Sequence, residues 1–416
     1  MNIGVLGLGY VGLTTALGFA SQGHTVLGLD IDPERCTLLT AQKMPFFEPD
    51  MEPVLKKCLS QKKFLLAKTP TDLADAEIIF FCVGTPSAAD NSVDLEFLLQ
   101  ALEQILAVQK DSAASRIYVI KSSIPPSSMR QVIMPFVNKL TSGRKIKLHV
   151  AVNPEFLREA HSWQDFMHPD RIIIGTDDEE AHQKLQELYL PFRAPIVKVS
   201  PTTAEFIKYL SNCALANLIS FANEMSAAAS AIGDIDIKNA FAALHLDNRW
   251  HGSGIAAYCY PGCGYGGYCL PKDTLAMAAV AKKFKADMPL LDSTVQTNRE
   301  RPAQIAREIA VRLKQLPSNT YQIGILGLAF KPGSADTRCS PALPVIKNLQ
   351  KLGISKIIAF DPLAMSDFQK IADINIAYAS DAQTVLAQAS LSVLLTAWPE
   401  FKNLAKEKIL DYRYYL

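Results

Sequence analysis

The sequence predicts an α/β protein in which two doubly wound domains are joined by a long central helix. Short apolar strands alternate with helical stretches from Ile3 to Val199, a pattern typical of a mostly parallel sheet covered by helices. Residues 203–232 contain neither Pro nor Gly and are rich in Ala, which indicates one continuous helix. The alternation of strands and helices restarts at Gln322. These changes favour three domains, at residues 1–200, 201–317 and 318–416.

The composition argues against several classes of protein. The chain has 416 residues and a net charge of +1, with acidic and basic residues mixed along the sequence. That pattern fits neither a nucleic-acid-binding patch nor a polybasic membrane anchor. A strand begins directly after Met1 and no apolar run reaches membrane-spanning length, so we expect a cytoplasmic protein. The eight Cys are irregularly spaced without a CxxC pair, which argues against disulfides or a zinc site and predicts no bound metal.

A glycine fingerprint, GLGYVG, joins the first strand to the first helix. It follows the apolar strand Ile3–Leu6 and precedes the helical stretch Leu13–Ser21. Gly7 allows the tight turn, Gly9 lets a pyrophosphate approach the backbone, and Gly12 lets helix and strand pack closely. The start of the helix supplies backbone N–H groups for the phosphates. In this context the fingerprint predicts a dinucleotide-binding, Rossmann-like domain.

An acidic residue ends the second strand. Asp30 directly follows the strand Thr25–Leu29, where a carboxylate can accept hydrogen bonds from both ribose hydroxyls of NAD. The same carboxylate would repel the 2′-phosphate of NADP. The sequence therefore predicts NAD as the cofactor.

Polar residues follow several later strands of the first domain. The expected strands are Glu77–Val83, Arg116–Ile120, Leu148–Val152, Arg171–Ile174 and Ile196–Val199. Thr85, Ser123, Glu155 and Glu159 come after three of them. Ligands of doubly wound sheets bind at the carboxyl ends of the strands, so these residues are candidates for a site. Each taken singly is more typical of a loop cap.

A glycine-rich loop at residues 261–273, PGCGYGGYCLPKD, carries the strongest candidate nucleophile. Its four glycines allow close approach to another group, and a helix is expected over Thr274–Ala286. If that helix starts near Pro271, Cys269 lies at its positive end, where a thiolate is favoured. Asp273 lies one turn further on, within reach of a water at the sulfur. The alternative is a turn with a buried, inert Cys.

The long helix carries two polar residues, Lys208 and Asn212, at i and i+4, which places them on one face. A solvated stripe is the alternative interpretation of that pair. The apolar character of the helix is typical of a dimer core or an interdomain strut. Arg249 is expected in a loop after it, and a further helix over Pro302–Leu316.

The second α/β half is expected to contain the strands Ile323–Leu326, Lys356–Phe360 and Leu391–Thr396. It lacks a GxGxxG fingerprint, so we do not expect it to bind a second dinucleotide. Lys331 follows its first strand, where it can meet a phosphate. We identify no residue-level repeat between the two halves.

Together these segments resemble the nucleotide-sugar 6-dehydrogenase family (UDP-glucose/GDP-mannose dehydrogenases), whose best-known members oxidise UDP-glucose to UDP-glucuronate. The matching segments, in family order and covering nearly the whole chain, are GLGYVG (7–12), Asp30, VGTP (83–86), KSSIPP (121–126), NPEFLRE (153–159), AEFIKYLSN (204–212), GYGGYCLPKD (264–273) and GLAFKPGSADTR (327–338). The resemblance implies two Rossmann-like domains joined by a helix that forms a homodimer. It also implies a four-electron oxidation of a primary alcohol at sugar C6 with two NAD.

The resemblance also implies roles for single residues. Cys269 matches the nucleophile that adds to the aldehyde, and Asp273 matches the acid that assists water. Lys208 and Asn212 match groups that steady the oxyanion. The other residues expected in catalysis are Ser123, Glu155 and Glu159. Those expected at the cofactor are Gly7, Gly9, Tyr10, Val11, Gly12, Asp30, Arg35, Thr85, Ser123, Glu159 and Arg338. Those expected at the nucleotide sugar are Glu155, Phe156, Leu157, Arg158, Lys208, Asn212, Arg249, Tyr258, Gly266 and Lys331. Arg249 is expected to reach the substrate of the neighbouring subunit.

The chemistry of such an oxidation agrees with these roles. A thiohemiacetal on Cys269 holds the aldehyde and makes the second hydride available. The resulting thioester then needs water and a base such as Asp273 or Glu155. The sequence leaves the identity of the sugar undecided, because Tyr258–Pro261 departs from the family pattern and Ala160 replaces a usual Gly. The alternatives are the same chemistry on GDP-mannose or another nucleotide sugar, a two-electron dehydrogenase with a structural Cys269, and a non-catalytic sensor.

Overall fold

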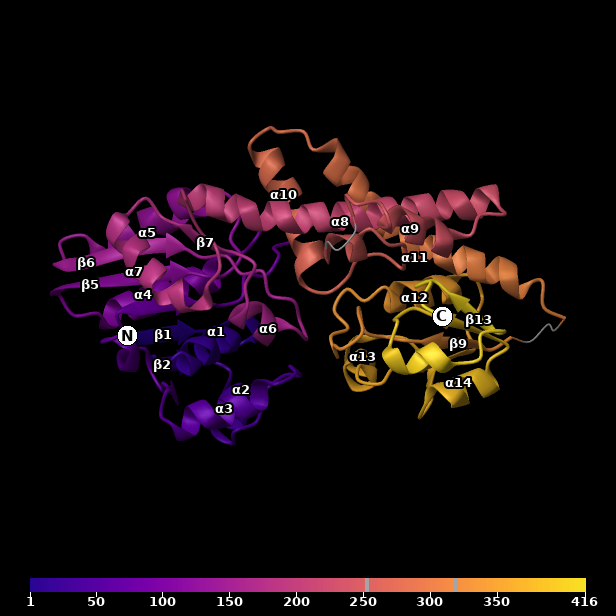
Figure 1. Cartoon of the computed structure of the whole chain (residues 1–416), viewed down its shortest axis with the longest axis horizontal. Coiled ribbons are helices and arrows are strands. Elements are labelled where there is room, and N and C mark those ends of the chain that lie inside the picture. Colours follow the sequence, from indigo (N-terminus) through magenta and orange to yellow (C-terminus); the bar gives the residue numbers. More distant parts are fainter. Residues whose placement is uncertain (251–253, 318–320) are drawn as a thin grey trace. The chain divides into compact units, whose positions relative to one another are not determined.

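The computed structural model describes residues 1–250, 254–317 and 321–416. These residues form two compact units, Met1–Leu210 and Ser211–Leu416 (Figure 1). The long helix α8, Pro201–Ile232, belongs to both, because the division falls within it. Among the described residues, no helix combines the length and the apolar character that crossing a membrane requires. The predicted boundary at residue 318 lies outside the described residues, and the division into three domains stays a prediction.

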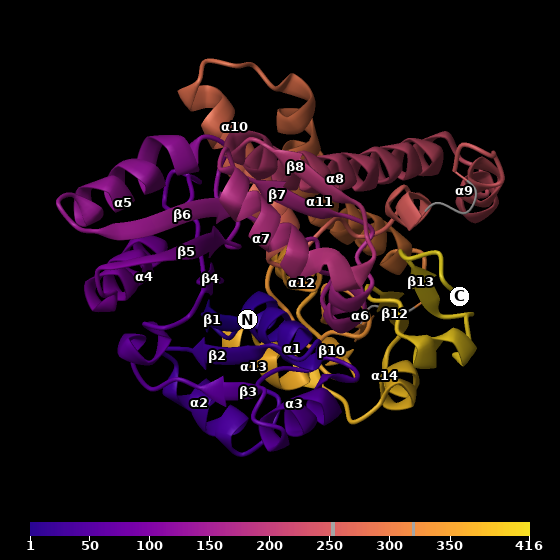
Figure 2. The same ribbon diagram turned by 60° about the vertical axis from the view of Figure 1, so that its left-hand side comes forward.

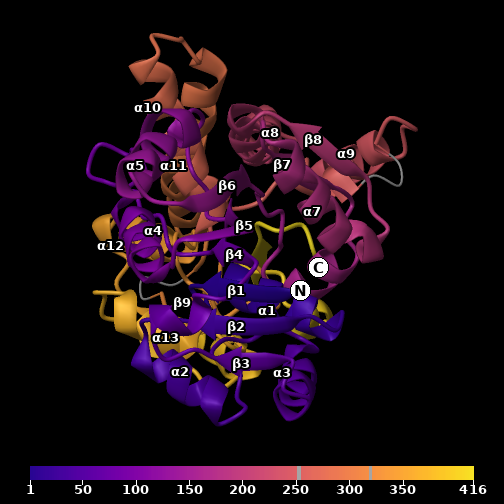
Figure 3. The same cartoon turned by 90° about the vertical axis from the view of Figure 1, so that its left-hand side faces the viewer.

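The first unit is built on an eight-stranded sheet with the order β3-β2-β1-β4-β5-β6-β7-β8, which can be followed in Figure 3. Neighbouring strands are parallel except β6 and β7, which pair antiparallel. The strands are β1 (Asn2–Leu6), β2 (Thr25–Leu29), β3 (Phe64–Leu66), β4 (Ile78–Phe81), β5 (Ser112–Ile120), β6 (Ile146–Val152), β7 (Ile172–Gly175) and β8 (Ile196–Val199). This confirms the mostly parallel, doubly wound sheet.

Helices cover both faces of this sheet (Figure 2). They are α1 (Tyr10–Ser21), α2 (Pro33–Thr40), α3 (Met51–Ser60), α4 (Glu96–Val108), α5 (Met134–Thr141), α6 (Ser162–Met167) and α7 (Glu179–Tyr189). Strand β4 shows why two cores form, since successive side chains of a strand point to opposite faces. Ile78 and Phe80 pack with α1, α3, α6 and α7, whereas Ile79 and Phe81 pack with α4 and α5. The strand order reverses between β1 and β4, which places the glycine fingerprint at the switch point.

The second unit combines helices with a five-stranded parallel sheet of order β11-β10-β9-β12-β13. Its strands are β9 (Ile323–Leu326), β10 (Ile357–Phe360), β11 (Ala377–Tyr378), β12 (Leu391–Leu394) and β13 (Ile409–Asp411). Its helices after α8 are α9 (Ile237–His245), α10 (Cys269–Lys283), α11 (Pro289–Leu313), α12 (Ala342–Lys351), α13 (Met365–Ile371) and α14 (Ala382–Gln388). The sheet order confirms a second doubly wound, Rossmann-like fold.

The two sheets begin with the same sequence pattern, so the expectation that no residue-level repeat exists was wrong. Residues 3–9 read IGVLGLG and residues 323–329 read IGILGLA, and each segment contains most or all of the first strand of its sheet and the turn that follows it. Gly7 and Gly327 both adopt positive φ, at 82° and 97°. In the second copy, Asp361 accepts the N–H groups of Leu328 and Ala329 and the indole of Trp398.

Two helix predictions can be compared with the structure. Helix α8 ends at Ile232 as expected and begins two residues before Thr203. The helix expected over Pro302–Leu316 was wrong at its start, because Pro302 lies inside α11. Pro is usual in the first turn of a helix, whereas inside a helix it removes one N–H and its ring crowds the carbonyl four residues earlier. The helix nevertheless continues through Pro302, and Ile305 and Ile309 of the following turns are fully buried.

Candidate active site

The fingerprint loop leaves open space at one glycine and none at the other two. A Cβ built at Gly12 would lie 1.7 Å from the Gly7 carbonyl oxygen, so Gly12 is required by the packing of α1 against the turn. A Cβ at Gly7 would lie 2.8 Å from the Cys82 carbonyl oxygen. At Gly9 a Cβ would meet no atom within 4 Å. Gly9 therefore borders free space at the N-terminus of α1, where a pyrophosphate can reach backbone N–H groups.

Asp30 is held beside this loop by three donors. Its Oδ2 accepts the Leu8 N–H at 2.5 Å and the Arg35 guanidinium at 2.8 Å, and its Oδ1 accepts the Asp32 N–H at 2.8 Å. The structure thus brings together Asp30 and Arg35, two residues predicted for the cofactor. A carboxylate fixed to the fingerprint loop suits the adenosine ribose of NAD, and its charge disfavours a 2′-phosphate.

Tyr10 and Glu159 also lie near each other in the first unit. The Tyr10 ring stacks on Phe46 with 4.2 Å between the ring centroids, and its hydroxyl donates to the Phe47 carbonyl at 2.6 Å. Burial raises the pKa of Tyr10 well above its usual value, and the carboxylates of Glu159 and Glu48 raise it further. Tyr10 is therefore a neutral side chain that links the fingerprint to the segment between α2 and α3, with the Glu159 carboxylate nearby.

Thr85 and Ser123 meet at the carboxyl ends of neighbouring strands β4 and β5. The Thr85 hydroxyl, which is buried, donates to the Ser123 carbonyl at 3.0 Å. The loop after β5 is further fixed where the Ser122 hydroxyl donates to the Val83 carbonyl at 2.7 Å. These contacts place Ser123 beside the switch point of the sheet.

Glu155 and Lys208 form a buried ion pair. The Lys208 Nζ donates to Glu155 Oε1 at 2.7 Å and to the Glu155 carbonyl at 2.8 Å, while the Leu157 N–H donates to Oε2 at 2.6 Å. Their side chains are only 7% and 5% exposed. Burial acts to raise the pKa of Glu155, but Lys208 and the hydrogen bonds outweigh it and hold that pKa below its usual value. Lys208 thus keeps the Glu155 carboxylate charged despite its burial.

A second buried lysine, which the sequence reasoning missed, lies behind that pair. Lys121 donates to Asn153 Oδ1 at 2.8 Å, and the Tyr189 hydroxyl donates to the same oxygen at 2.5 Å. Burial lowers the pKa of Lys121 to about 8. Lys121 is the first residue of the family segment KSSIPP, and Asn153 is the first residue of NPEFLRE. Their places in these two segments were the sequence signal that could have identified them. Tyr189 comes from α7, and nothing in its sequence surroundings predicts this contact.

The glycine loop of the second unit is clamped by two helices. The Asn298 side chain of α11 accepts the Tyr265 N–H at 2.7 Å and donates to the Tyr265 carbonyl at 3.0 Å. Asn223 of α8 accepts the Gly262 N–H at 2.7 Å. Gly264 has a φ of 104°, and a Cβ at Gly266 would lie 2.3 Å from the Cys339 carbonyl oxygen. The glycines are thus needed for both conformation and close packing.

Cys269 is the first residue of α10 and is exposed. The helix therefore begins earlier than the expected Thr274, and the thiol lies at its positive end. One turn later Asp273 is fully buried, and it accepts Asn212 Nδ2 at 2.5 Å and Lys272 Nζ at 2.6 Å. The structure thus joins two further predicted residues, Asn212 and Asp273. An accessible thiol with a fixed carboxylate on the same helix is suited to covalent catalysis.

The sequence matches the three domains of one family. Residues 1–193 match the NAD-binding domain, residues 202–300 the central domain and residues 324–414 the UDP-binding domain of the UDP-glucose/GDP-mannose dehydrogenase family. The chain belongs to this family. It is accordingly an NAD-dependent oxidoreductase, and the fit of the fingerprint and Asp30 to NAD agrees with that.

Similar proteins carry related names. A UDP-glucose 6-dehydrogenase of Rickettsia bellii is 35% identical over 98% of this chain and 92% of its own length. The structure of a UDP-glucose dehydrogenase from Pyrobaculum islandicum covers 100% of this chain and 94% of that one, with a TM-score of 0.92 and 34% identity. A UDP-D-ManNAc dehydrogenase from Pyrococcus horikoshii has a TM-score of 0.86 and 28% identity, covering 100% and 96% of the two chains. The family, rather than one sugar, is what these matches share.

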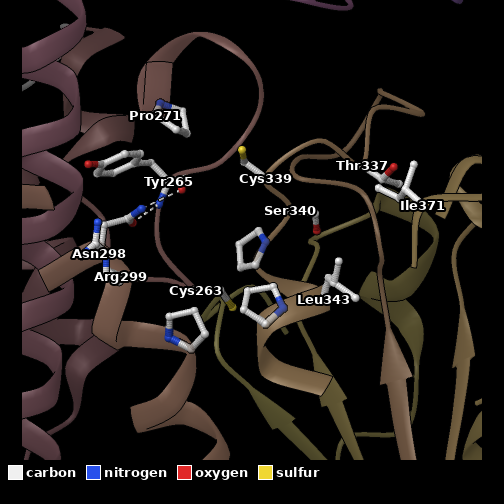
Figure 4. Close-up of a pocket in the computed structure, with 13 residues that line it drawn as sticks. Cys263, Tyr265, Pro271, Asn298, Arg299, Thr337, Cys339, Ser340, Leu343 and Ile371 are labelled. Carbon is white, nitrogen blue, oxygen red and sulfur yellow. Dashed lines mark hydrogen bonds between the residues drawn. The ribbon is translucent and has the colours of Figure 1, made fainter. Parts of the chain in front are cut away.

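A pocket of about 330 Å³ lies beside the glycine loop of this dehydrogenase (Figure 4). It is lined by Cys263 and Tyr265 of the loop, by Asn298 of α11 and by Cys339 and Ser340 before α12. Most of its remaining lining is Pro, Leu and Ile. Cys269 is not part of the lining, so this apolar pocket does not contain the predicted nucleophile.

Two residues predicted from the family resemblance, Arg249 and Arg158, have exposed side chains, whereas Arg338 contacts the glycine loop, because its carbonyl accepts the Gly267 N–H at 3.1 Å. Arg249 is 85% exposed and pairs with Asp247 at 2.5 Å. Arg338 pairs with Asp336 at 2.7 Å and lies 4.9 Å from the Tyr268 ring. Arg158 pairs with Asp165 at 2.7 Å and is 59% exposed.

Of the other predicted sugar ligands, Lys331 and Tyr258 belong to the second unit, whereas Phe156 belongs to the first and lies beside the Glu155–Lys208 pair. The Lys331 Nζ lies 5.6 Å from the Phe330 ring centroid, and Tyr258 ends the short turn Gly254–Tyr258. Phe156 lies under the Arg171 guanidinium at 4.1 Å and near Lys208 at 5.6 Å. Over residues 1–250, 254–317 and 321–416, no group of three or more His, Cys, Asp or Glu side chains is arranged to hold a metal ion.

Proposed function

We propose that this protein oxidises UDP-glucose at C6 to UDP-glucuronate through a covalent intermediate on Cys269, with two NAD⁺ reduced to two NADH, one water supplying the second carboxylate oxygen, and protons released. The observation that carries this proposal is the exposed Cys269 at the start of α10, with Asp273 fixed one turn away. A plain alcohol dehydrogenase needs no nucleophile, whereas oxidation to an acid gains from one.

The first step is removal of a hydride and a proton from the C6 alcohol. NAD⁺, bound at the fingerprint of β1 and α1, supplies the hydride acceptor. Glu155 is the candidate base, because it is kept ionised by Lys208 despite its burial. Lys208 and Asn212 donate to the oxygen as negative charge develops on it.

The second step oxidises the aldehyde while it is bound. The Cys269 sulfur adds to C6 and forms a thiohemiacetal, whose oxyanion is steadied by Lys208 and Asn212. Loss of the second hydride from C6 gives a thioester. Asp273 then takes a proton from water as it attacks the thioester carbon, and the sulfur leaves as the acid is released. The positions of Asn212 and Lys272 around Asp273 support this role by fixing the carboxylate.

The choice of sugar rests on the more similar relatives. The proteins at 35% and 34% identity are named for UDP-glucose, whereas the UDP-D-ManNAc enzyme is at 28%. The alternatives are GDP-mannose or another nucleotide hexose, and a two-electron dehydrogenase. A panel of UDP-glucose, UDP-galactose, UDP-ManNAc and GDP-mannose, scored by NADH release, tests the assignment. We expect UDP-glucose to have the highest kcat/KM, and a higher value for GDP-mannose would contradict the proposal.

We further propose a homodimer formed by α8, within a chain divided into a cofactor domain (1–200), a central domain (201–317) and a nucleotide-sugar domain (318–416). Helix α8 carries an exposed apolar stripe at the spacing of one helix face. Its members are Phe206, Leu210, Phe221, Met225 and Ile232, all more than 40% exposed. Exposed large apolar side chains along one helix face are often covered by a partner, and an isologous contact with a second copy would cover them.

The exposed Arg249 can then serve the partner's substrate. Mixing inactive Cys269→Ser chains with inactive Arg249→Ala chains should restore part of the activity, because a mixed dimer would contain one complete site. No recovery in verified mixed dimers would contradict a shared site.

A further inference from the structure

The carboxylate of Glu205 is buried against the loop that follows β5. Glu205 lies in the first turns of α8 and is 1% exposed. Its Oε2 accepts the Ser127 N–H at 2.6 Å, and its Oε1 accepts the Met129 N–H at 2.7 Å. Met129 begins the short π-helical turn Met129–Ile133 that leads into α5. The N–H groups of Ser127 and Met129 therefore have no preceding turn of helix whose carbonyls could accept their hydrogen bonds. Charge-assisted hydrogen bonds of this kind are among the stronger ones in proteins.

The loop segment that Glu205 holds has an unusual backbone. The Ser128 N–H donates to the Pro125 carbonyl at 3.0 Å and closes a tight turn. Ser127, the third residue of that turn, has a φ of 76°, a value that glycine adopts easily and serine does not. A strained residue persists only when its surroundings hold it. The two hydrogen bonds to Glu205, from Ser127 itself and from Met129 two residues later, provide that hold.

The same loop carries Ser123 at its other end. Ser123 is separated from Ser127 by a buried Ile124 and by two prolines, whose rings fix φ. A displacement at Ser127 is therefore transmitted to Ser123 rather than absorbed. On the helix side, Lys208 lies three residues after Glu205, and it pairs with Glu155. Glu205 thus ties the loop that bears Ser123 to the helix that bears Lys208.

We propose that Glu205 is a positioning residue for the dehydrogenation, whose ionised carboxylate holds the Ser123 loop in place and whose protonation loosens it. This inference rests on the proposed roles of Ser123 and Lys208. Glu205 itself needs no contact with substrate or cofactor. A neutral carboxylic acid has one oxygen that donates, so it can no longer accept from both backbone N–H groups.

The charges around Glu205 set the pH range of this effect. Burial raises the pKa of Glu205 to about 7, although the N–H groups of Met129 and Ser127 and the charge of Arg130 act to lower it. Arg130 faces Glu205 from the loop side and is itself paired with Asp177 at 2.8 Å. On its own helix the nearby charge is Lys208, which Glu155 neutralises. The hold on the loop is therefore full above about pH 8 and weakens as the pH falls through neutrality.

The first test compares wild type with Glu205→Gln, which keeps the shape but turns one acceptor into a donor. We expect kcat to fall roughly tenfold or more at pH 8, since small displacements of catalytic groups have large effects on rate. The ratio of wild-type to variant kcat should approach one at pH 6, because wild type itself is then protonated. Asp178→Asn is the matched control, since it removes a carboxylate that accepts the Ala181 N–H at the start of α7. A ratio independent of pH would overturn the proposal.

Two further measurements do not depend on activity. Amide hydrogen exchange at Ser127 and Met129, corrected for intrinsic rates, should be faster in Glu205→Gln and in wild type at pH 6 than in wild type at pH 8. Unchanged exchange would overturn the inference, even if the variant folds poorly. Adding Ser127→Gly should restore part of the activity of Glu205→Gln, because glycine adopts the required φ unaided. If Ser123→Ala is fully active, the proposed role of Ser123 fails, whereas the exchange result still reports on Glu205 alone.

Discussion

Breaking the buried pair between Lys208 and Glu155 should have a large and pH-dependent cost. In Lys208→Met the carboxylate of Glu155 would remain in a site where both side chains are less than 10% exposed. Removing one member of a buried ion pair costs about 3–5 kcal/mol of unfolding free energy. We therefore expect Lys208→Met to lose about 4 kcal/mol at pH 8, measured by urea unfolding.

The sign of the pH dependence follows from the pKa of Glu155. In wild type that pKa is held below its usual value because Lys208 outweighs the effect of burial, so the stabilisation is lost only as the pH falls through the lowered pKa. Without Lys208 burial prevails and the pKa rises, so the variant is most stable at low pH and loses stability as the pH rises. The difference in unfolding free energy between wild type and Lys208→Met should thus be smaller at pH 5 than at pH 8.

A double variant separates stability from catalysis. Lys208→Met with Glu155→Gln contains no unpaired charge and should unfold within about 1 kcal/mol of wild type at both pH values. It should still release no NADH, because both proposed catalytic groups are gone. A pH-independent gap in the single variant would refute the electrostatic reasoning. Recovery of activity in the double variant would show that the pair is structural only.

Three other predictions follow from the cofactor loop and the thiol. Asp30→Ala should relax the preference for NAD over NADP, as measured by the ratio of the two kcat/KM values, and equal use of both by wild type would contradict the ribose contact. Gly9→Ala should weaken NAD binding at unchanged Tm, whereas Gly12→Ala should lower Tm, because only the second methyl would strike the protein. Equal effects of the two on Tm would be inconsistent with this geometry. Cys269→Ser should bind NAD with wild-type affinity yet form no uronate, since a hydroxyl is a weaker nucleophile than a thiolate. Uronate formed by that variant at the wild-type rate would exclude the covalent route.

The sequence predicted those parts of the fold that depend on local patterns. The strands β2, β8 and β9 have the expected bounds, because apolar residues flanked by polar or glycine residues define them. The sequence also predicted a helix after the glycine loop, but it did not show that this helix, α10, begins at Cys269. That starting point depends on how Asn223 and Asn298 clamp the preceding loop, and these come from helices distant in sequence.

Sequence motifs nominate the candidate site residues but do not show the contacts between them. Pairing of Glu155 with Lys208, and of Asp273 with Asn212, joins positions more than 50 residues apart, which no spacing rule reveals. Glu205 had a usable signal, since a carboxylate in a mostly apolar helix needs a partner. The partners themselves are backbone N–H groups of a loop, and the sequence does not show those.

The stoichiometry of NADH release tests the central claim most directly. A known, limiting amount of UDP-glucose is converted to completion with excess NAD, and NADH is measured together with the sugar product. The proposed chemistry predicts two NADH for each UDP-glucose and UDP-glucuronate as the product, with no free aldehyde. One NADH for each sugar, with the aldehyde accumulating, would contradict the covalent four-electron mechanism and leave Cys269 without its proposed role.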